Sequence, residues 1–226
     1  MQKRKNGILL HITSLPGAEG IGTLGKEAYA FVDFLQESGQ KLWQILPLGP
    51  VGPGNSPYQC YSAFAGEPLL IDLETLLNEG LLSCEDFDNI PRFLKSKVDF
   101  KKVSIWKQAL LKKAFQQFYN FKFDEYRNEY NHFLNEHGWW LNDYALFISV
   151  RGYFGGLHWK EWDRGIKFRE LAVVHEYSER LKQQINFEKF LQFMFFRQWH
   201  RLKQYANERE IQIVGDVPLY VSGDSA

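Results

Sequence analysis

The stretch GILLHITS at residues 7–14 and the stretch LWQILPL at residues 42–48 decide the fold of this 226-residue chain. Each is a short apolar run that suits a β-strand, and glycines punctuate the sequence between them. Apolar residues recur there at helical spacing, at Ala28, Phe31, Val32 and Leu35. Gly39 stands where a glycine commonly ends a helix. The sequence therefore predicts a strand, a helix and a second strand, which make a βαβ unit with parallel strands.

The rest of the chain predicts a large, mainly helical insertion and then a return to the sheet. Residues 49–57 hold three glycines and three prolines, which predicts a shaped loop. Apolar stripes at residues 103–118 and 126–134 predict two helices, and a stripe at residues 187–206 predicts a helix of about five turns. Residues 211–221 then read as a buried strand that is interrupted by a polar residue.

This order of elements predicts an α/β protein in which strands alternate with helices, as in an α/β barrel. We assign residues 1–48 to the first strands and helix, residues 49–186 to the loop and the helical insertion, and residues 187–226 to a further helix and the third strand. Three strands cannot close a barrel. Either the sheet is small and open, or the chain stops before its domain does.

The composition argues against several classes of function. The 27 basic and 27 acidic side chains balance, so no excess positive charge is available to attract nucleic acid. No stretch approaches the length of an apolar membrane span. The two cysteines, Cys60 and Cys84, suit reduced thiols in a cytoplasmic protein better than a disulfide framework.

The sequence predicts neither a metal nor another cofactor. His132 and His137 are five residues apart, so they miss the spacing that places two metal ligands on one face of a helix. The glycines at 20, 22 and 25 fall one residue short of the dinucleotide-binding fingerprint, and the next strand lacks the acidic residue that should follow it.

Asp216 is the first candidate for function. It follows an apolar β run, and α/β barrels place their active sites at the carboxyl ends of their strands. The alternative, which position alone leaves equally open, is a carboxylate that caps the following loop. Asp224, further along, reads as a loop or helix-cap residue.

The run Ser56-Pro57-Tyr58-Gln59 offers a hydroxyl, a phenol and an amide in a proline-rigidified loop after a strand. Such a set suits a sugar, because sugar hydroxyls need neutral donors and acceptors while the apolar sugar face needs a ring. An ordinary turn with a buried tyrosine is the competing interpretation. Trp159 and Trp162 could also stack on sugars, although core packing is the more common use of such residues.

Several longer blocks carry a resemblance to a known family. They lie at residues 7–17, 39–50, 55–66, 68–73 and 215–221, with Asp224-Ser225-Ala226 at the end. Together they resemble the amylomaltase and disproportionating-enzyme family of 4-alpha-glucanotransferases, glycoside hydrolase family 77, and the matching is weaker between residues 82 and 153. The chain departs from the family at Glu67, where Asn is usual, and at His158 and Asp163, where prolines are expected.

The resemblance implies the N-terminal part of a (β/α)8 barrel with a large helical insertion after the second strand. It also implies retaining transfer of α-1,4-glucan segments, which needs a nucleophile and an acid/base carboxylate roughly 5 Å apart. In the family these carboxylates follow the third strand, so the resemblance places them C-terminal to Ala226. Ser56, Tyr58, Gln59 and Asp216 match family positions that bind the glucan. A non-catalytic glucan-binding fragment is the alternative.

Overall fold

The computed structural model describes residues 4–52, 54–217 and 222–226. Its three strands are β1 (Gly7–Leu9), β2 (Leu42–Gln44) and β3 (Gln212–Val214). Its α-helices are α1 (Lys26–Glu37), α2 (Leu73–Asn78), α3 (Phe100–Gln117), α4 (Phe123–Tyr153), α5 (Arg164–Lys167), α6 (Leu171–Arg180) and α7 (Lys182–Glu208). The described chain is therefore an α/β protein in which helices predominate. Within it, none of the helices is both long enough and apolar enough to span a membrane.

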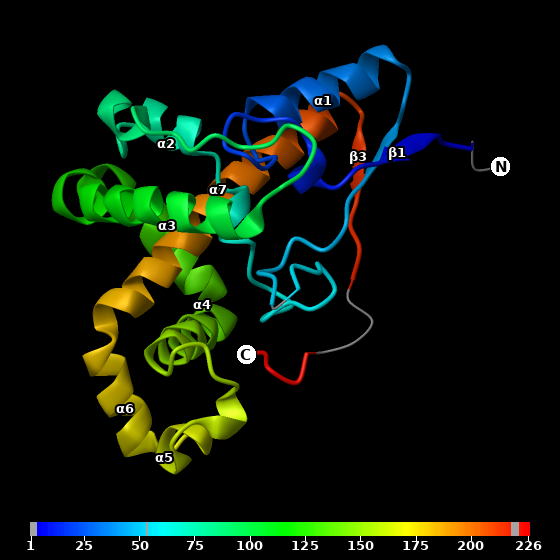
Figure 1. The fold of residues 1–226 in the computed structure, drawn as a ribbon. Helices are drawn as coiled ribbons and strands as arrows, with labels where there is room; N and C mark the ends of the chain where they lie inside the picture. The colour runs from blue at the N-terminus through cyan, green and yellow to red at the C-terminus, as the bar shows by residue number, and fades with distance from the viewer. Residues whose placement is uncertain (1–3, 53, 218–221) are drawn as a thin grey trace.

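The strands form one parallel sheet in the order β1-β2-β3. Ile8 pairs with Trp43, and Trp43 pairs with Ile213. Helix α1 connects β1 to β2, whereas the long segment that ends in α7 connects β2 to β3 (Figure 1). The predicted βαβ unit is confirmed, and the predicted return to the sheet after the insertion is confirmed with it.

The strands are shorter than the apolar runs that predicted them. After β1 the chain turns away, and residues Ile12–Ser14 form a 3-10 helix. The prediction of a buried third strand is wrong, since Val214 is 40% exposed and Val217 is 74% exposed. The reason is that β3 pairs with β2 alone among the described residues, so that little packs against its sides. Residues 218–221 of the predicted run lie outside the described residues.

Trp43 of β2 lies at the centre of the packing between the sheet and α1. Its side chain is fully buried, and its ring meets Phe31 of α1 edge to face at 5.0 Å. Its indole nitrogen donates to the carbonyl oxygen of Leu10 at 2.8 Å, which satisfies the one polar atom of the ring. Helix α1 ends where the sequence predicts, because Gly39 adopts a left-handed φ of +71°.

The insertion packs on α7 through a cluster of aromatic rings. Helices α3 and α4 are joined by a short π-helical segment, Phe118–Lys122. Phe118 is fully buried, and its ring lies within 5.5 Å of those of Tyr126, Tyr130 and Phe190. The predicted helices of the insertion are confirmed, and α7 begins at Lys182, earlier than the stripe that predicted it.

Helix α7 also holds the segment that leads from β2 to α2, by means of two buried glutamines. The Gln192 side chain accepts from the Gly66 N–H at 2.7 Å and donates to the Gly66 carbonyl at 2.9 Å. Gln198 does the same with Asp72, at 2.7 and 3.1 Å. Each glutamine side chain therefore accepts from the N–H and donates to the C=O of one residue. A neighbouring strand would make the same kinds of bond.

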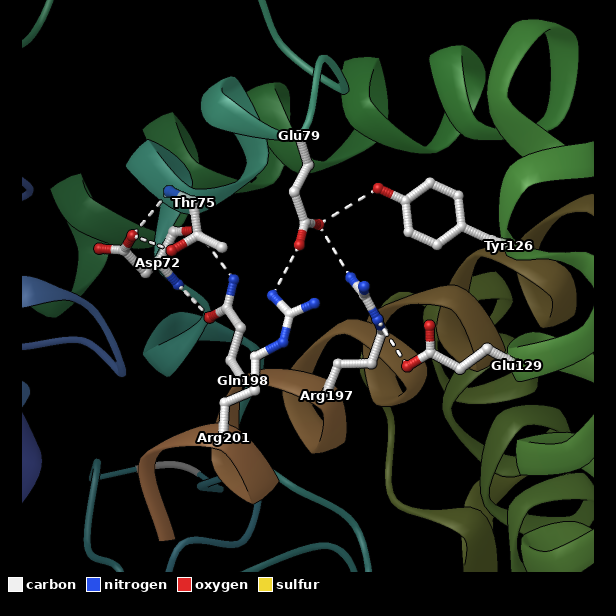
Figure 2. A network of polar contacts seen from close by, with 8 residues as sticks. All are labelled: Asp72, Thr75, Glu79, Tyr126, Glu129, Arg197, Gln198 and Arg201. Carbon is white, nitrogen blue, oxygen red and sulfur yellow. Dashed lines mark hydrogen bonds and ion pairs between the residues drawn. The ribbon is translucent and has the colours of Figure 1, made fainter. Parts of the chain in front are cut away.

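Beyond Asp72, an ion-pair network also attaches the residue that follows α2 to helix α7 (Figure 2). Glu79, just after α2, accepts hydrogen bonds from Arg197 at 2.8 Å and from Arg201 at 2.7 Å. Arg197 also donates to Glu129 of α4 at 2.8 Å and lies 4.9 Å from the centre of the Tyr126 ring. The network joins α2, α4 and α7 at one point.

A second charged contact is buried between α3 and the loop after β1. The Lys107 side chain is fully buried, pairs with Glu19, and donates to the carbonyl oxygen of Ile71 at 2.7 Å. Glu19 also accepts from the Leu73 N–H at 2.9 Å. Burial raises the pKa of Glu19, and the charge of Lys107 opposes that rise.

Candidate functional site

The loop that follows β2 is folded into a narrow turn. Val51 and Cys60 form an antiparallel bridge, and the Gly52 N–H donates to the carbonyl oxygen of Gln59 at 2.8 Å. At the tip, Gly54 and Asn55 have φ values of +95° and +55°. A left-handed φ is open to glycine and tolerated by asparagine, which accounts for these residue types at the tip. The turn presents residues 56–59 at the surface.

Two of the four predicted site residues meet in the structure. The Tyr58 hydroxyl donates to Oδ2 of Asp216 at 2.7 Å, and Oδ1 of Asp216 accepts from the Val217 N–H at 2.8 Å. The hydrogen bond to Asp216 raises the pKa of Tyr58. Tyr58 is 42% exposed, so the competing interpretation of a buried tyrosine is wrong. The pair presents a phenol ring and a partly buried carboxylate next to one another.

Ser56 and Gln59 lie on the same loop as Tyr58, but neither side chain takes part in the contact with Asp216 among the described residues. Oγ of Ser56 accepts from the Tyr58 N–H at 3.4 Å, so the hydroxyl helps shape the turn. The Gln59 side chain is exposed, while the Gln59 N–H donates to the carbonyl oxygen of Ser56 at 3.0 Å.

The residues at the C-terminal end of the chain lie against this loop and against the insertion (Figure 1). Asp224 accepts from the Trp159 N–H at 3.3 Å, at the start of the short 3-10 helix Trp159–Glu161, whose N-cap residue is His158. It also pairs with Arg151 of α4 at 3.1 Å. The sequence gives no signal for Arg151, because its partner lies 73 positions away.

The paired tryptophans have separate roles. Trp162 is 8% exposed and packs against Phe147 and Phe154, so core packing is the correct interpretation for it. Trp159 is only partly buried, and its indole nitrogen donates to the carbonyl oxygen of Gly223 at 2.7 Å. Both rings line a cavity of about 330 Å³ that Ala226 also borders.

A smaller cavity, of about 160 Å³, lies beside the loop after β2. Asn55 and Pro57 of the loop line it, together with His11, whose buried Nδ1 has no hydrogen-bond partner among the residues that the structure describes. Burial lowers the pKa of His11. Across residues 4–52, 54–217 and 222–226, no three His, Cys, Asp or Glu side chains are grouped so as to bind a metal ion.

Comparison with known proteins places this geometry in a family. A family model described as 4-alpha-glucanotransferase matches residues 10–226. The 4-alpha-glucanotransferase of Synechocystis is 46% identical over 226 residues, which are 100% of this chain and 45% of that protein. That of Thermus thermophilus is 45% identical and is matched by 99% of this chain over 44% of its own length.

Solved structures agree with the sequence comparison. The amylomaltase from Streptococcus agalactiae in complex with acarbose superposes with a TM-score of 0.94 at 43% identity, over 99% of this chain and 45% of that one. The amylomaltase from Corynebacterium glutamicum gives a TM-score of 0.71 at 17% identity over 97% of this chain and 31% of that one, which shows a shared fold. The chain thus spans less than half the length of these relatives. On the match over residues 10–226, the chain belongs to the 4-alpha-glucanotransferase family.

Proposed function

We propose that the full-length protein is a 4-alpha-glucanotransferase that transfers α-1,4-glucan segments to the 4-hydroxyl of an acceptor glucan or glucose. The observation that carries this proposal is the hydrogen bond between Tyr58 and Asp216, which joins two loops of the predicted glucan site at 2.7 Å. An exposed ring beside a carboxylate suits a sugar, because the ring contacts the apolar sugar face and the carboxylate accepts from sugar hydroxyls.

The proposal includes the finer architecture. The three strands are the first three of a (β/α)8 barrel, and residues 49–186 are an insertion after the second strand. In parallel barrels the active site lies at the carboxyl ends of the strands. The loop with Tyr58 follows β2 and Asp216 follows β3, so both belong to that end of the sheet.

Ser56, Tyr58, Gln59 and Asp216 bind the glucan in this proposal, and they do not perform the chemistry. Retaining transfer needs a carboxylate nucleophile and an acid/base about 5 Å from it. These two groups lie beyond Ala226, in the part of the protein that the relatives possess in addition. The residues of this chain orient the sugars beside the scissile bond, and a cleft poor in water favours an acceptor hydroxyl over water.

The partners follow from this proposal. Maltooligosaccharides and fragments of starch or glycogen are the substrates, and a related amylomaltase has been solved in complex with acarbose. We also propose a cytoplasmic location, in keeping with the free thiols of Cys60 and Cys84.

Incubation with maltotriose tests the function. The full-length protein should release glucose and form maltooligosaccharides longer than maltotriose, whereas the 226-residue chain should form neither. Products from the short chain would show that the catalytic carboxylates lie within it. Full-length protein that binds maltooligosaccharides without forming products would support the non-catalytic alternative, and glucose and maltose without longer products would indicate a hydrolase.

A further inference from the structure

Arg151 makes two contacts at the end of α4 that the proposed function leaves unexplained. Its guanidinium pairs with Oδ2 of Asp224 through Nε at 3.2 Å and through Nη2 at 3.1 Å. The same guanidinium lies 4.8 Å from the centre of the Tyr61 ring. Both charged side chains are largely buried, with 16% of Arg151 and 15% of Asp224 exposed. An ion pair at this depth is shielded from water and therefore has a defined geometry.

The backbone around Arg151 leaves room for this arrangement. Arg151 lies in the last turn of α4, where the helix dipole favours a positive charge. The chain then reverses through Gly155 and Gly156, whose φ values are +65° and +86°. A Cβ atom at Gly156 would lie 3.2 Å from Nη1 of Arg151, so a larger residue there would crowd the guanidinium.

The insertion holds the segment around Asp224 at further points. Oδ1 of Asp224 accepts from the Trp159 N–H at 3.3 Å and lies 3.8 Å from Nδ1 of His158. The indole of Trp159 donates to the carbonyl oxygen of Gly223 at 2.7 Å. The segment is also tied directly to the site loop, because the Ala226 N–H donates to the carbonyl oxygen of Tyr61 at 2.8 Å.

These contacts connect the same two segments that Tyr58 and Asp216 connect. Tyr61 follows Tyr58 in the loop after β2, and Asp224 follows Asp216 in the segment after β3. The hydroxyl of Tyr58 joins the segments at one point, and Arg151 joins them at another by contacting Tyr61 and Asp224 at once. With the bond from the Ala226 N–H to the carbonyl oxygen of Tyr61, the described parts of the two segments are joined at three points, and Arg151 supplies the one that a charged side chain of α4 makes.

Resting on the proposed function, we propose that Arg151 is a positioning residue for the glucan site: it fastens the loop that carries Tyr58 to residues 222–226 without touching the sugar. Among the contacts that the helical insertion makes here, the Arg151 guanidinium is the one that touches both Tyr61 and Asp224. A misplacement of reacting groups by about 1 Å can lower the rate of an enzyme by roughly a hundredfold. We therefore expect the loss of Arg151 to lower the rate of glucan transfer more than it lowers the stability of the protein.

The test uses the full-length protein with R151Q and R151K, and with R127Q as the matched control. Arg127 forms an exposed ion pair with Asp124 on the same helix, so its loss removes an equivalent charge away from the site. We expect R151Q to lower kcat/KM for maltotriose by tenfold or more and R127Q to leave it unchanged. R151K should recover only part of the loss, because an ammonium cannot provide the planar guanidinium contacts.

A double-mutant cycle separates positioning from general destabilisation. If Arg151 acts through the Tyr58–Asp216 pair, the loss that R151Q causes should shrink when Tyr58→Phe has already broken that pair. Losses that multiply independently would overturn the proposal. So would an R151Q enzyme with wild-type kcat/KM.

Hydrogen–deuterium exchange tests the fastening without relying on activity. In R151Q the amides of residues 56–61 and 222–226 should exchange at least tenfold faster, and in R127Q they should not. Unchanged exchange in R151Q would overturn the inference even in an active enzyme. A full-length protein that lacks transfer activity would instead contradict the proposed function, and the exchange result would still decide whether Arg151 fastens the two segments.

Discussion

The hydroxyl of Tyr58 reaches Oδ2 of Asp216 at 2.7 Å, although 158 positions separate the two residues in sequence. The contact depends on the sheet, because β2 and β3 are neighbouring parallel strands and each residue lies in the segment that follows one of them. Their proximity is therefore a consequence of the sheet topology, which places a ring and a carboxylate beside the carboxyl ends of the strands.

Breaking this pair should impair glucan transfer. We expect Tyr58→Phe and Asp216→Asn each to lower kcat/KM of the full-length protein for maltotriose by on the order of tenfold, since each removes or weakens a hydrogen bond to a charged group. Tyr205→Phe is the matched control, because Tyr205 donates to Asp33 at 2.8 Å between α7 and α1. Activities of the two site variants equal to that of the control would remove these residues from the site.

Stability should fall as pH rises towards neutrality, because of Glu188. Glu188 lines a cavity of about 250 Å³ with Glu67 and Tyr144. Burial raises its pKa from 4.5 to about 7, and the charge of Glu67 adds to the rise. The folded protein therefore holds a proton that the unfolded chain releases above pH 4.5, so stability present at low pH is lost between about pH 4.5 and pH 7.

The shift in the pKa of Glu188 limits this loss of stability to roughly 3 kcal/mol. Urea titrations of the full-length protein from pH 4.5 to pH 7.5 should show the decline, and Glu188→Gln should flatten it. Burial also raises the pKa of Glu67, so Glu67→Gln should reduce the decline in part. Glu179→Gln, which changes a largely exposed carboxylate, should have no such effect. A wild-type slope in Glu188→Gln would contradict the assignment.

Removing one partner of the buried Lys107–Glu19 pair should be costly. Lys107→Met should lower the free energy of unfolding by about 3–5 kcal/mol, because it removes the positive charge that offsets the burial of the Glu19 carboxyl. Adding Glu19→Gln should recover part of the loss, since the amide still accepts from the Leu73 N–H. Lys113→Met is the control on the same helix. The Lys113 side chain, which pairs with Asp86, is 58% exposed, so its loss should cost less than about 1 kcal/mol.

Replacing a buried glutamine of α7 by an apolar residue should lower the stability of the protein. Gln198→Leu should lower the free energy of unfolding by about 2–3 kcal/mol, because it leaves both the N–H and the carbonyl of Asp72 without their partner. Gln204→Leu is the control, since Gln204 makes an exposed bond to Glu208. Chemical denaturation of the two variants measures the difference, and equal stabilities would show that the backbone of Asp72 finds other partners.

Helices α1, α3, α4 and α7 were predictable from the sequence because each buries an apolar stripe, whereas the sequence did not predict the shorter helices α2, α5 and α6. The apolar residues of α1, α3, α4 and α7 recur with the helical period, and Gly39 marks an end that its backbone conformation requires. The strands were predictable in position and order but not in extent. Apolar residues continue beyond β1 in the sequence, yet the pairing with β2 stops where the chain turns into the 3-10 helix Ile12–Ser14.

The sequence could name Tyr58 and Asp216 as candidates, but it could not predict the contact between them. Tyr58 and Asp216 each follow an apolar run, which is a local signal. The pairing of Arg151 with Asp224 has no local signal, because it depends on how the insertion returns to the sheet. The contact between Gln192 and Gly66 also has no local signal. A glutamine within an apolar stripe indicates that its side chain is buried, but the sequence does not show which residue it contacts.

The parallel pairing of β2 with β3 has a consequence for synthesis on the ribosome. Gln44 emerges long before Gln212, so of the described strands only β1 and β2 can pair while the segment between β2 and β3 is being made. Two short strands are marginal without further packing, and chains fold from the N-terminus as they appear. We therefore expect α1 and then the insertion to protect the nascent β2 edge. A slow-folding insertion would leave that edge open to pairing with a neighbouring nascent chain.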